Sequence, residues 1–221
     1  MCFHGRRPIL RQVPGATRSS KKVILLCVVL GGLLVCSPFL IRAFVVEAFQ
    51  IPSGGMAPTL LVGDHILCSK WVGRARRGDV VVFRYPPDPS TDYIKRVIGV
   101  PGDTIQSSPD GVTLNGHPVP RRPLGNSCPQ GMQEPVACEQ WEEMIDGRTY
   151  EVVTQGGRGP FGPVVVPEGN VFVMGDNRDN SSDSRVWGFL PIANIKAHAM
   201  VVWWSQDEHG VRWDRLNHPV R

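Results

Sequence analysis

The chain has 221 residues, of which 24 are Lys or Arg and 20 are Asp or Glu, so its formal net charge is +4; 42% of the residues are hydrophobic and 20% are charged. These values are typical of a globular protein with a sizeable core, and they exclude a disordered, collagen-like or coiled-coil chain. Six of the bases and none of the acids lie in residues 1–22, which leaves 18 bases against 20 acids, a net charge of −2, in residues 23–221. We therefore expect no nucleic acid as a partner.

The first predicted element is a membrane-spanning helix that follows a basic arm. Residues 23–41 contain no charged side chain, and at 1.5 Å per residue they span about 28 Å, close to the ~30 Å hydrocarbon core of a bilayer. A cleaved signal peptide is the alternative, but the basic region of 22 residues and the long apolar run are not typical of one. The charges flanking the run predict a cytoplasmic arm over 1–22, one transmembrane helix over 23–42, and an exported domain over 45–221. The bases of the arm are Arg6, Arg7, Arg11, Arg18, Lys21 and Lys22.

Short apolar runs separated by turn residues follow in the exported part and predict a mainly β domain. No segment there shows the apolar periodicity of a helix. Asn115 and Gly116 form a hairpin signal after one of these runs. Residues 120–162 are rich in Pro, Gly and polar side chains, and we expect them to form an insertion or lid. The strand candidates are residues 80–83, 94–100, 112–114, 164–166, 171–174 and 200–204.

Two of the six cysteines are expected to form a disulfide. Cys128 and Cys138 lie in the insertion, on the exported side, where disulfides persist. A bond between them would close a loop of about ten residues and stabilise the fold by roughly 2–3 kcal/mol in the chain-entropy model. Their spacing and the lack of a nearby His fit no zinc pattern. Cys68, in an apolar stretch, is expected to be a small buried hydrophobic residue.

Four segments with candidate catalytic residues follow the predicted membrane span. They are FQIPSGGMAPTL at 49–60 with GD at 63–64, RGDVVVF at 77–83, YIKRVIG at 93–99 with PGD at 101–103, and GDNRDNSSDSR at 175–185. In this order they resemble the sequence boxes of the bacterial type I signal peptidases, over about residues 45–204. The resemblance implies an antiparallel β catalytic domain with one transmembrane helix in the bacterial cytoplasmic membrane, an N-terminus in the cytoplasm, and a Ser/Lys serine protease. It also implies that the enzyme removes the signal peptides of exported preproteins and needs no cofactor or metal.

The resemblance assigns roles to several polar residues. Lys95 matches the general base, and burial would have to lower its pKa from ~10.4. Ser53 matches the hydroxyl that binds the oxyanion together with the N–H of residue 55. Ser181 matches the serine that orients the lysine, and Asp183 with Arg185 resembles a structural ion pair. Taken alone, a Lys beside an Arg is more often a solvated surface pair, and the polar segment 175–185 reads as a turn.

The resemblance also implies an apolar groove for the residues before the cut. Shallow pockets would accept Ala-x-Ala ends, since a larger side chain would clash. Plain core packing is the alternative for each of these residues. The residues that would line the groove are Ile51, Pro52, Met56, Leu60, Tyr93 and Ile94 for the nearer pocket, and Phe49, Gln50, Ile66 and Val82 for the farther one.

Gly55 occupies the position at which the family carries its nucleophilic serine, and glycine has no atom that can attack a carbonyl. Three interpretations remain open. The chain is an inactivated version of a serine-bearing protein, or Ser53 attacks instead, or the chain is a pseudoprotease that binds signal peptides without cutting. The second is disfavoured because residues two apart in an extended chain lie ~6.6 Å from each other, whereas catalytic contacts need ~2.6–3.2 Å. A membrane-anchored binding or assembly factor is the alternative of a different class.

A cation-dependent hydrolase is a poor rival. Asp176, Asp179 and Asp183 are acidic, but they lack the ligand spacing of a calcium-binding loop.

Overall fold

The computed structural model describes residues 22–23, 25–31, 45–70, 73–128 and 137–221. The chain divides into two compact units, Met1–Ala43 and Phe44–Arg221. In the first unit the described residues are helical. No helix within the described residues is long and apolar enough to cross a membrane. Most of the arm expected over 1–22, and residues 24 and 32–42 of the expected span, lie outside the described residues.

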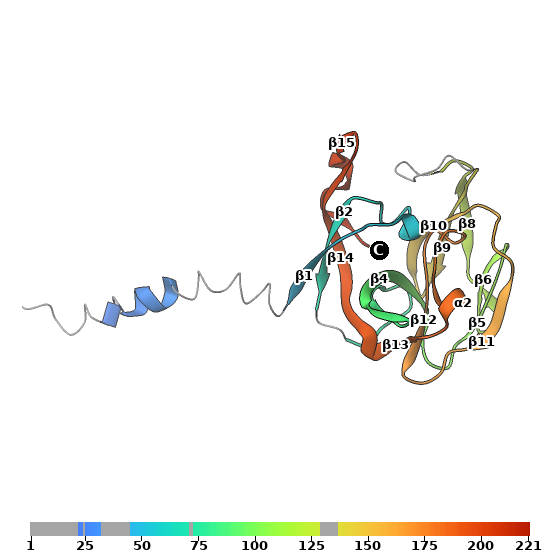
Figure 1. Ribbon diagram of the computed structural model, residues 1–221, viewed down its shortest axis with the longest axis horizontal. Coiled ribbons are helices and arrows are strands. Elements are labelled where there is room, and N and C mark those ends of the chain that lie inside the picture. The colour runs from blue at the N-terminus through green and yellow to red at the C-terminus, as the bar shows by residue number, and fades with distance from the viewer. Residues whose placement is uncertain (1–21, 24, 32–44, 71–72, 129–136) are drawn as a thin grey trace, which may run out of the picture. The chain divides into compact units, whose positions relative to one another are not determined.

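The second unit consists of antiparallel sheets, which confirms the mainly β class (Figure 1). Its strands are β1 (Val46–Gln50), β2 (Asp64–Ser69), β3 (Val80–Tyr85), β4 (Asp88–Gly99), β5 (Thr104–Ser108), β6 (Gly111–Leu114), β7 (His117–Pro118), β8 (Arg121–Gly125), β9 (Glu139–Ile145), β10 (Arg148–Thr154), β11 (Phe161–Val165), β12 (Asn170–Met174), β13 (Leu190–Pro191), β14 (Ile195–Asp207), β15 (Gly210–Val211) and β16 (His218–Pro219). The short helices are η1 (Gly54–Met56), α2 (Ser184–Trp187), η2 (Ile192–Asn194) and η3 (Trp213–Arg215).

The nine-stranded sheet has the order β1-β2-β14-β3-β4-β12-β13, and β15 and β16 pair with β14. Two smaller sheets have the orders β10-β9-β8 and β11-β5-β6-β7. In the view of Figure 1, β1 and β2 lie at one side of this unit, and the strands of the small sheets lie at the other. The strand β4 is flanked by β3 and β12, so its second half is an inner strand of the large sheet.

The inner strands are the ones that the sequence predicted best. Residues 80–83 of β3 are all buried, because β3 lies between β14 and β4 and is covered on both faces. Residues 171–174 of β12 are buried in the same way. A strand covered on both faces has a continuous apolar run, which is a direct sequence signal. The strand β4 begins at Asp88, earlier than the expected residue 94. Its first five residues are exposed, so no apolar run marks this start in the sequence.

The expected insertion over 120–162 contains the three-stranded sheet of β8, β9 and β10, which the sequence analysis did not predict. Asp146 and Gly147 have φ values of 49° and 77° and join β9 to β10, as an Asp-Gly hairpin turn does. Cys128 and Cys138 form a disulfide. The disulfide links Cys128, which lies shortly after β8, to Cys138, which directly precedes β9.

Three buried clusters make up the core of the second unit. One of them lies around η1 and β2 and consists of Ile51, Met56, Leu60, Ile66, Cys68, Val80, Val82, Ala197 and Val202. Cys68 is fully buried, as expected, and burial raises the pKa of its thiol to about 12. This cluster fixes the chain on both sides of position 55.

Candidate active site

Lys95 lies on the inner part of β4 and is only 6% exposed. Alternate residues of a strand share a face, and Lys95 Nζ lies 5.7 Å from the ring centroid of Tyr93. Burial lowers the pKa of Lys95 to about 8; Asp183 and Asp176 act to raise this pKa, and Arg185 acts to lower it. A substantial fraction of Lys95 is therefore neutral at mildly alkaline pH, as a general base must be.

Gly55 lies in η1 and is buried. A Cβ atom built on Gly55 would lie 3.2 Å from Lys95 Nζ, 3.5 Å from the Asn180 carbonyl oxygen and 3.9 Å from Ser181 Cα. The contact with Nζ is tight, but Nζ is the end of a flexible side chain and can adjust. A side chain at position 55 would thus point directly at the amine of Lys95. Position 54 differs, because a Cβ on Gly54 would meet nothing within 4 Å.

The segment 175–183 closes the site from the other side. The Asn177 N–H donates to the Gly55 carbonyl oxygen at 3.3 Å, and the Asn177 side-chain amide donates to the Gly54 carbonyl oxygen at 3.2 Å. A Cβ on Gly175 would lie 2.2 Å from Ser181 Oγ and 2.3 Å from the Gly55 carbonyl oxygen. Only glycine fits at position 175, and its absent side chain lets Ser181 approach η1.

Ser181 is 5% exposed, and its hydroxyl acts to lower the pKa of Asp183. Asp183 lies two residues further on and forms an ion pair with Arg185, with Nη2–Oδ2 at 2.6 Å and Nε–Oδ1 at 2.8 Å. The Gly175 N–H also donates to Asp183 at 3.1 Å. Burial acts to raise the pKa of Asp183, but Arg185 and this N–H outweigh it and hold the pKa below its usual range. Asp183 is therefore a fixed negative charge behind the site.

Ser53 directly precedes η1 in an extended conformation, with φ −140° and ψ 154°. It is exposed, and its side chain makes no capping hydrogen bond to η1. Its hydroxyl is thus accessible to a bound molecule, and its role in holding an oxyanion stays a prediction.

The residues expected to line the groove divide into three groups. Most of them belong to, or pack against, the buried cluster around η1 and β2: Phe49, Ile51, Met56, Leu60, Ile66, Val82 and Ile94. Gln50 and Pro52 are exposed at the end of β1 and just after it. Tyr93 instead packs against the cluster that contains Phe83 and Val97, and its ring stacks on Tyr85 at 4.2 Å.

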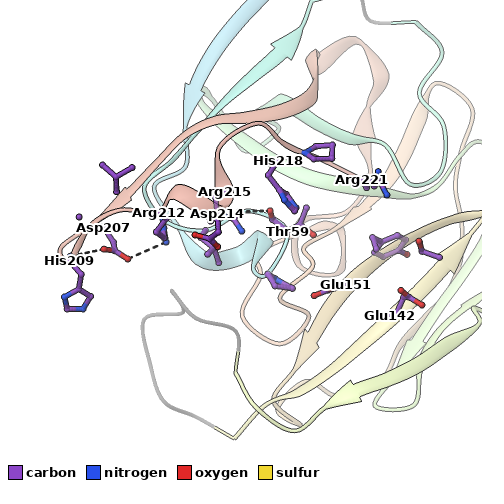
Figure 2. A pocket seen from close by; sticks show the side chains of 17 residues that line it. Thr59, Glu142, Glu151, Asp207, His209, Arg212, Asp214, Arg215, His218 and Arg221 are labelled. Carbon is purple, nitrogen blue, oxygen red and sulfur yellow. Dashed lines mark hydrogen bonds and ion pairs between the residues drawn. The ribbon is translucent and has the colours of Figure 1, made fainter.

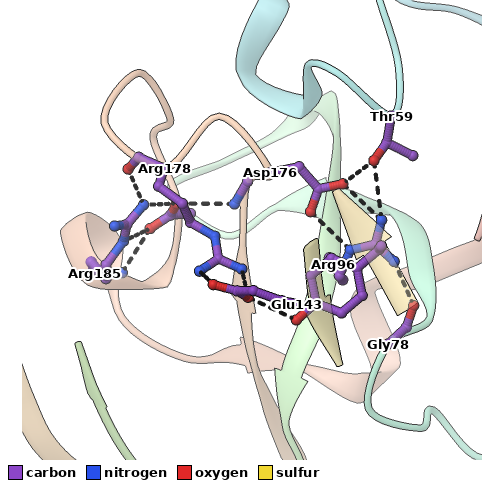
Figure 3. A network of polar contacts seen from close by, with 10 residues as sticks. Thr59, Gly78, Arg96, Glu143, Asp176, Arg178 and Arg185 are labelled. Carbon is purple, nitrogen blue, oxygen red and sulfur yellow. Dashed lines mark hydrogen bonds and ion pairs between the residues drawn. The ribbon is translucent and has the colours of Figure 1, made fainter. Parts of the chain in front are cut away.

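A buried ion pair beside the site was not identified from the sequence. Arg96 is fully buried, and its Nε and Nη2 donate to the Asp176 carboxylate at 2.8 and 2.7 Å (Figure 3). Thr59 Oγ1 donates to the same carboxylate at 2.6 Å, and Arg96 Nη1 donates to the Gly78 carbonyl oxygen at 2.9 Å. The alternation of side chains along β4 predicts that Arg96 lies on the face opposite to Lys95, but it does not predict the partner of Arg96. The pair therefore connects the turn after η1, β4 and the segment that follows β12.

A cavity of about 860 Å³ lies elsewhere, beside the C-terminal segment (Figure 2). Neither Gly55 nor Lys95 lines it. Acidic side chains, arginines and two histidines do so: Glu142, Glu151, Asp207, His209, Arg212, Asp214, Arg215, His218 and Arg221. Arg215 donates to Asp64 through Nε at 3.0 Å and to the Thr59 carbonyl oxygen at 3.0 Å. The C-terminal segment thereby holds the turn that follows η1.

On an antiparallel β fold, buried Lys95 thus faces the vacant side-chain position 55, and buried Ser181 lies beside that position. A serine at position 55 would complete a Ser/Lys dyad with Lys95. A family model described as signal peptidase, peptidase S26, matches residues 20–204. Signal peptidase I of Pseudomonas fluorescens is 41% identical over 197 residues, covering 76% of this chain and 68% of that protein. Signal peptidase I of Aquifex aeolicus is 35% identical over 208 residues, covering 78% of this chain and 81% of that protein. The chain belongs to the signal peptidase family of S26 serine endopeptidases.

A solved structure, a signal peptidase I from Enterococcus faecalis, is 23% identical and superposes with a TM-score of 0.37. The superposition covers 57% of this chain and 97% of the Enterococcus faecalis chain. The family assignment rests on the sequence matches. Among the described residues, no group of three or more His, Cys, Asp or Glu side chains can hold a metal ion.

Proposed function

We propose that this chain is a signal peptidase I, built to remove the signal peptides of exported preproteins by a Ser/Lys mechanism. The observation that carries the proposal is the 3.2 Å between Lys95 Nζ and a Cβ at position 55. It supports position 55, rather than Ser53, as the site of the nucleophile.

In the proposed reaction a serine hydroxyl at position 55 attacks the carbonyl carbon of the scissile peptide bond, and neutral Lys95 takes its proton. The Ser53 hydroxyl and the N–H of residue 55 hold the resulting oxyanion. The intermediate collapses, the C–N bond breaks, and protonated Lys95 gives its proton to the departing amine. Water then attacks the acyl-enzyme ester, again with Lys95 as base, and releases the signal peptide with a free carboxylate.

Substrate selection in this proposal comes from the groove formed by β1, η1 and the face of β4. Ile51 and Met56 are buried and Ile94 is half-buried in its apolar floor, which would accept only small residues before the cut. Ala-x-Ala ends fit such a floor.

We also propose the membrane arrangement that the sequence predicts. Residues 1–22 form a cytoplasmic arm, residues 23–42 a single transmembrane helix in the bacterial cytoplasmic membrane, and residues 45–221 the peptidase domain on the extracytoplasmic side. The charge-free run at 23–41 supports the span, and the basic arm supports the orientation.

Gly55 leaves this site without its attacking oxygen, although the base and its surroundings are in place. An inactive homologue that only binds signal peptides rests on Gly55 alone, and the named relatives, which are all peptidases, do not support it. Replacing Gly55 by Ser supplies the missing atom at a position that faces Lys95.

The test is cleavage of a purified preprotein with an Ala-x-Ala site, in detergent at mildly alkaline pH. The unaltered chain, Gly55→Ser, and Gly55→Ser with Lys95→Ala are compared. We expect Gly55→Ser alone to cleave. Cleavage that survives Lys95→Ala would refute the dyad. Cleavage by the unaltered chain would indicate that Ser53 is the nucleophile. Failure of Gly55→Ser together with tight signal-peptide binding would favour the binding protein.

A further inference from the structure

The insertion forms several hydrogen bonds to the loop that carries Ser181. The Gln155 and Arg158 N–H groups both donate to the Asp179 carboxylate, at 2.5 and 3.0 Å. The backbone adds two more bonds: the Val153 N–H donates to the Asp176 carbonyl oxygen, and the Arg178 N–H to the Val153 carbonyl oxygen, both at 2.9 Å. The end of β10 and the residues after it therefore hold the loop on which the site depends.

The guanidinium of Arg158 also contacts that loop. Its Nη2 donates to the Ser181 carbonyl oxygen at 2.9 Å, and its Nη1 lies 3.7 Å from Asp183 Oδ1. The Arg158 side chain is 26% exposed, whereas that of Asp183 is fully buried. Asp183 thus has two cationic neighbours, Arg185 from its own helix and Arg158 from the insertion.

We propose that Arg158 is a positioning residue for the general base: it fixes Ser181 against η1 and balances part of the charge of Asp183 that acts on Lys95. This rests on the proposed function only in taking Lys95 as the base. The insertion then sets the basicity of the site, whatever it does for substrate access.

The charges that face Lys95 give the sign of the effect. Asp183 and Asp176 favour the protonated amine, and Arg185 disfavours it; Tyr93 is the nearest aromatic group on the same strand. The residue of β3 that pairs with Lys95, Val81, carries no charge, and η1 carries none either. A positive charge at Arg158 weakens the pull of Asp183 on the proton of Lys95. Removing that charge should therefore raise the pKa of Lys95 and reduce its neutral fraction at a given pH.

The direct test measures the titration of Lys95 in the whole chain with Gly55 retained, so it does not depend on activity. The chain has five lysines, so ¹³C-lysine labelling gives five side-chain ¹³Cε signals, and Lys95→Ala identifies the one of interest. The variants are Arg158→Gln, Arg158→Met and Arg158→Lys. The matched control is Arg122→Gln, an arginine of the same insertion whose side chain is 67% exposed and pairs with Glu142.

We expect Arg158→Gln to raise the pKa of Lys95, by less than the ~1–3 that a charge within ~4–6 Å causes, because Arg158 acts through Asp183. Arg158→Met, which keeps the stem but not the charge, should give the same rise if Arg158→Gln does not fold. Arg158→Lys should restore most of the value, and Arg122→Gln should leave it unchanged. An unchanged pKa in both uncharged variants, or an equal rise in Arg122→Gln, would overturn the proposal.

A kinetic arm links the effect to catalysis. In the Gly55→Ser background, Arg158→Gln should move the acid limb of the kcat/KM profile to higher pH by the same amount, in addition to any fall in plateau kcat that comes from the lost contact with Ser181. A loss at all pH values without a shift would indicate a merely structural role and contradict the proposal. If Gly55→Ser does not cleave, the proposed function fails, but the titration of Lys95 still decides the role of Arg158.

Discussion

The buried pair of Arg96 and Asp176 gives the sharpest prediction about stability. Their side chains are 0% and 1% exposed, and two hydrogen bonds join them. In Asp176→Asn the carboxylate charge is lost, while the guanidinium of Arg96 remains buried without a counter-charge. Removing one partner of a buried ion pair typically costs about 3–5 kcal/mol of the free energy of unfolding.

The size of the effect on thermal unfolding follows from the length of the chain. For a domain of this size, 1 kcal/mol shifts Tm by about 2–4 °C, so we expect Asp176→Asn to lower Tm by roughly 6–20 °C. The assay is circular dichroism of the full chain in detergent. Arg122→Gln is the control, because the exposed Arg122–Glu142 pair should be worth at most about 1 kcal/mol.

A double variant separates the ion pair from general disruption of packing. Arg96→Met with Asp176→Leu removes both charges, and replacing a buried pair by apolar residues of similar size is often neutral or stabilising. Thr59 and the Gly78 carbonyl oxygen lose partners, so we expect partial recovery, with at least about half of the loss in Tm regained. A double variant whose loss in Tm equals the sum of the losses in Arg96→Met alone and Asp176→Leu alone would refute the reasoning. So would a single variant within 1 °C of the unaltered chain.

Three further predictions concern the site itself. In the Gly55→Ser variant, kcat/KM should rise with pH through about 8 and then level off, because only neutral Lys95 accepts the proton; a flat profile from pH 6 to 10 would contradict this assignment. Gly175→Ala in that background should reduce cleavage by roughly 10²-fold, since its Cβ would lie 2.3 Å from the Gly55 carbonyl oxygen, whereas Gly54→Ala, with open space, should fold with unchanged Tm. In the unaltered chain the unfolded state keeps the Lys95 proton to about pH 10.4 and the folded state only to about pH 8, so folding stability rises with pH in that window. Lys95→Met should therefore stabilise the fold by up to about 3 kcal/mol at pH 7 and by less at pH 10, as measured by urea unfolding.

The clearest sequence signals belong to strands whose side chains are buried on both faces. Residues 80–83 and 171–174 contain no polar interruption, so their apolar runs are visible without any knowledge of the partners. The strand β14 was expected only over 200–204, although it covers Ile195–Asp207. Its register shifts between Ala199 and Val201 and again between Val202 and Trp204, and such irregularities break the alternation that a sequence pattern needs.

The sheet within the insertion was missed for a related reason. β9 and β10 carry Glu and Arg on partly exposed positions, so neither strand has an apolar run. The Asp146–Gly147 turn between them was the available signal. The many exposed polar residues of β9 and β10 give these strands the composition of a loop.

The candidate site could be assembled from its motifs, but the contacts that hold it could not. The family boxes contain Lys95, Ser181 and position 55, and the structure brings these three together. The partner of Arg96 is 80 residues away, and nothing in the spacing of the two residues indicates the pair. Arg158 lies in a Gly-rich stretch without a motif, so only the fold reveals its contact with the Ser181 carbonyl oxygen.

The long-range contacts explain how the site keeps its geometry around a missing side chain. The Gly54 and Gly55 carbonyl oxygens accept hydrogen bonds from Asn177. The Asp176 carboxylate of the buried ion pair accepts from Thr59, in the turn after η1. Gly175 has no side chain, which leaves room for the Gly55 carbonyl oxygen beside it. None of these contacts uses a side chain at position 55. A serine introduced there would enter a site already shaped by β4, β12 and the insertion, and would need only a small movement of Lys95 Nζ. The arrangement is thus preorganised for the proposed nucleophile, an oxygen atom on a side chain at position 55.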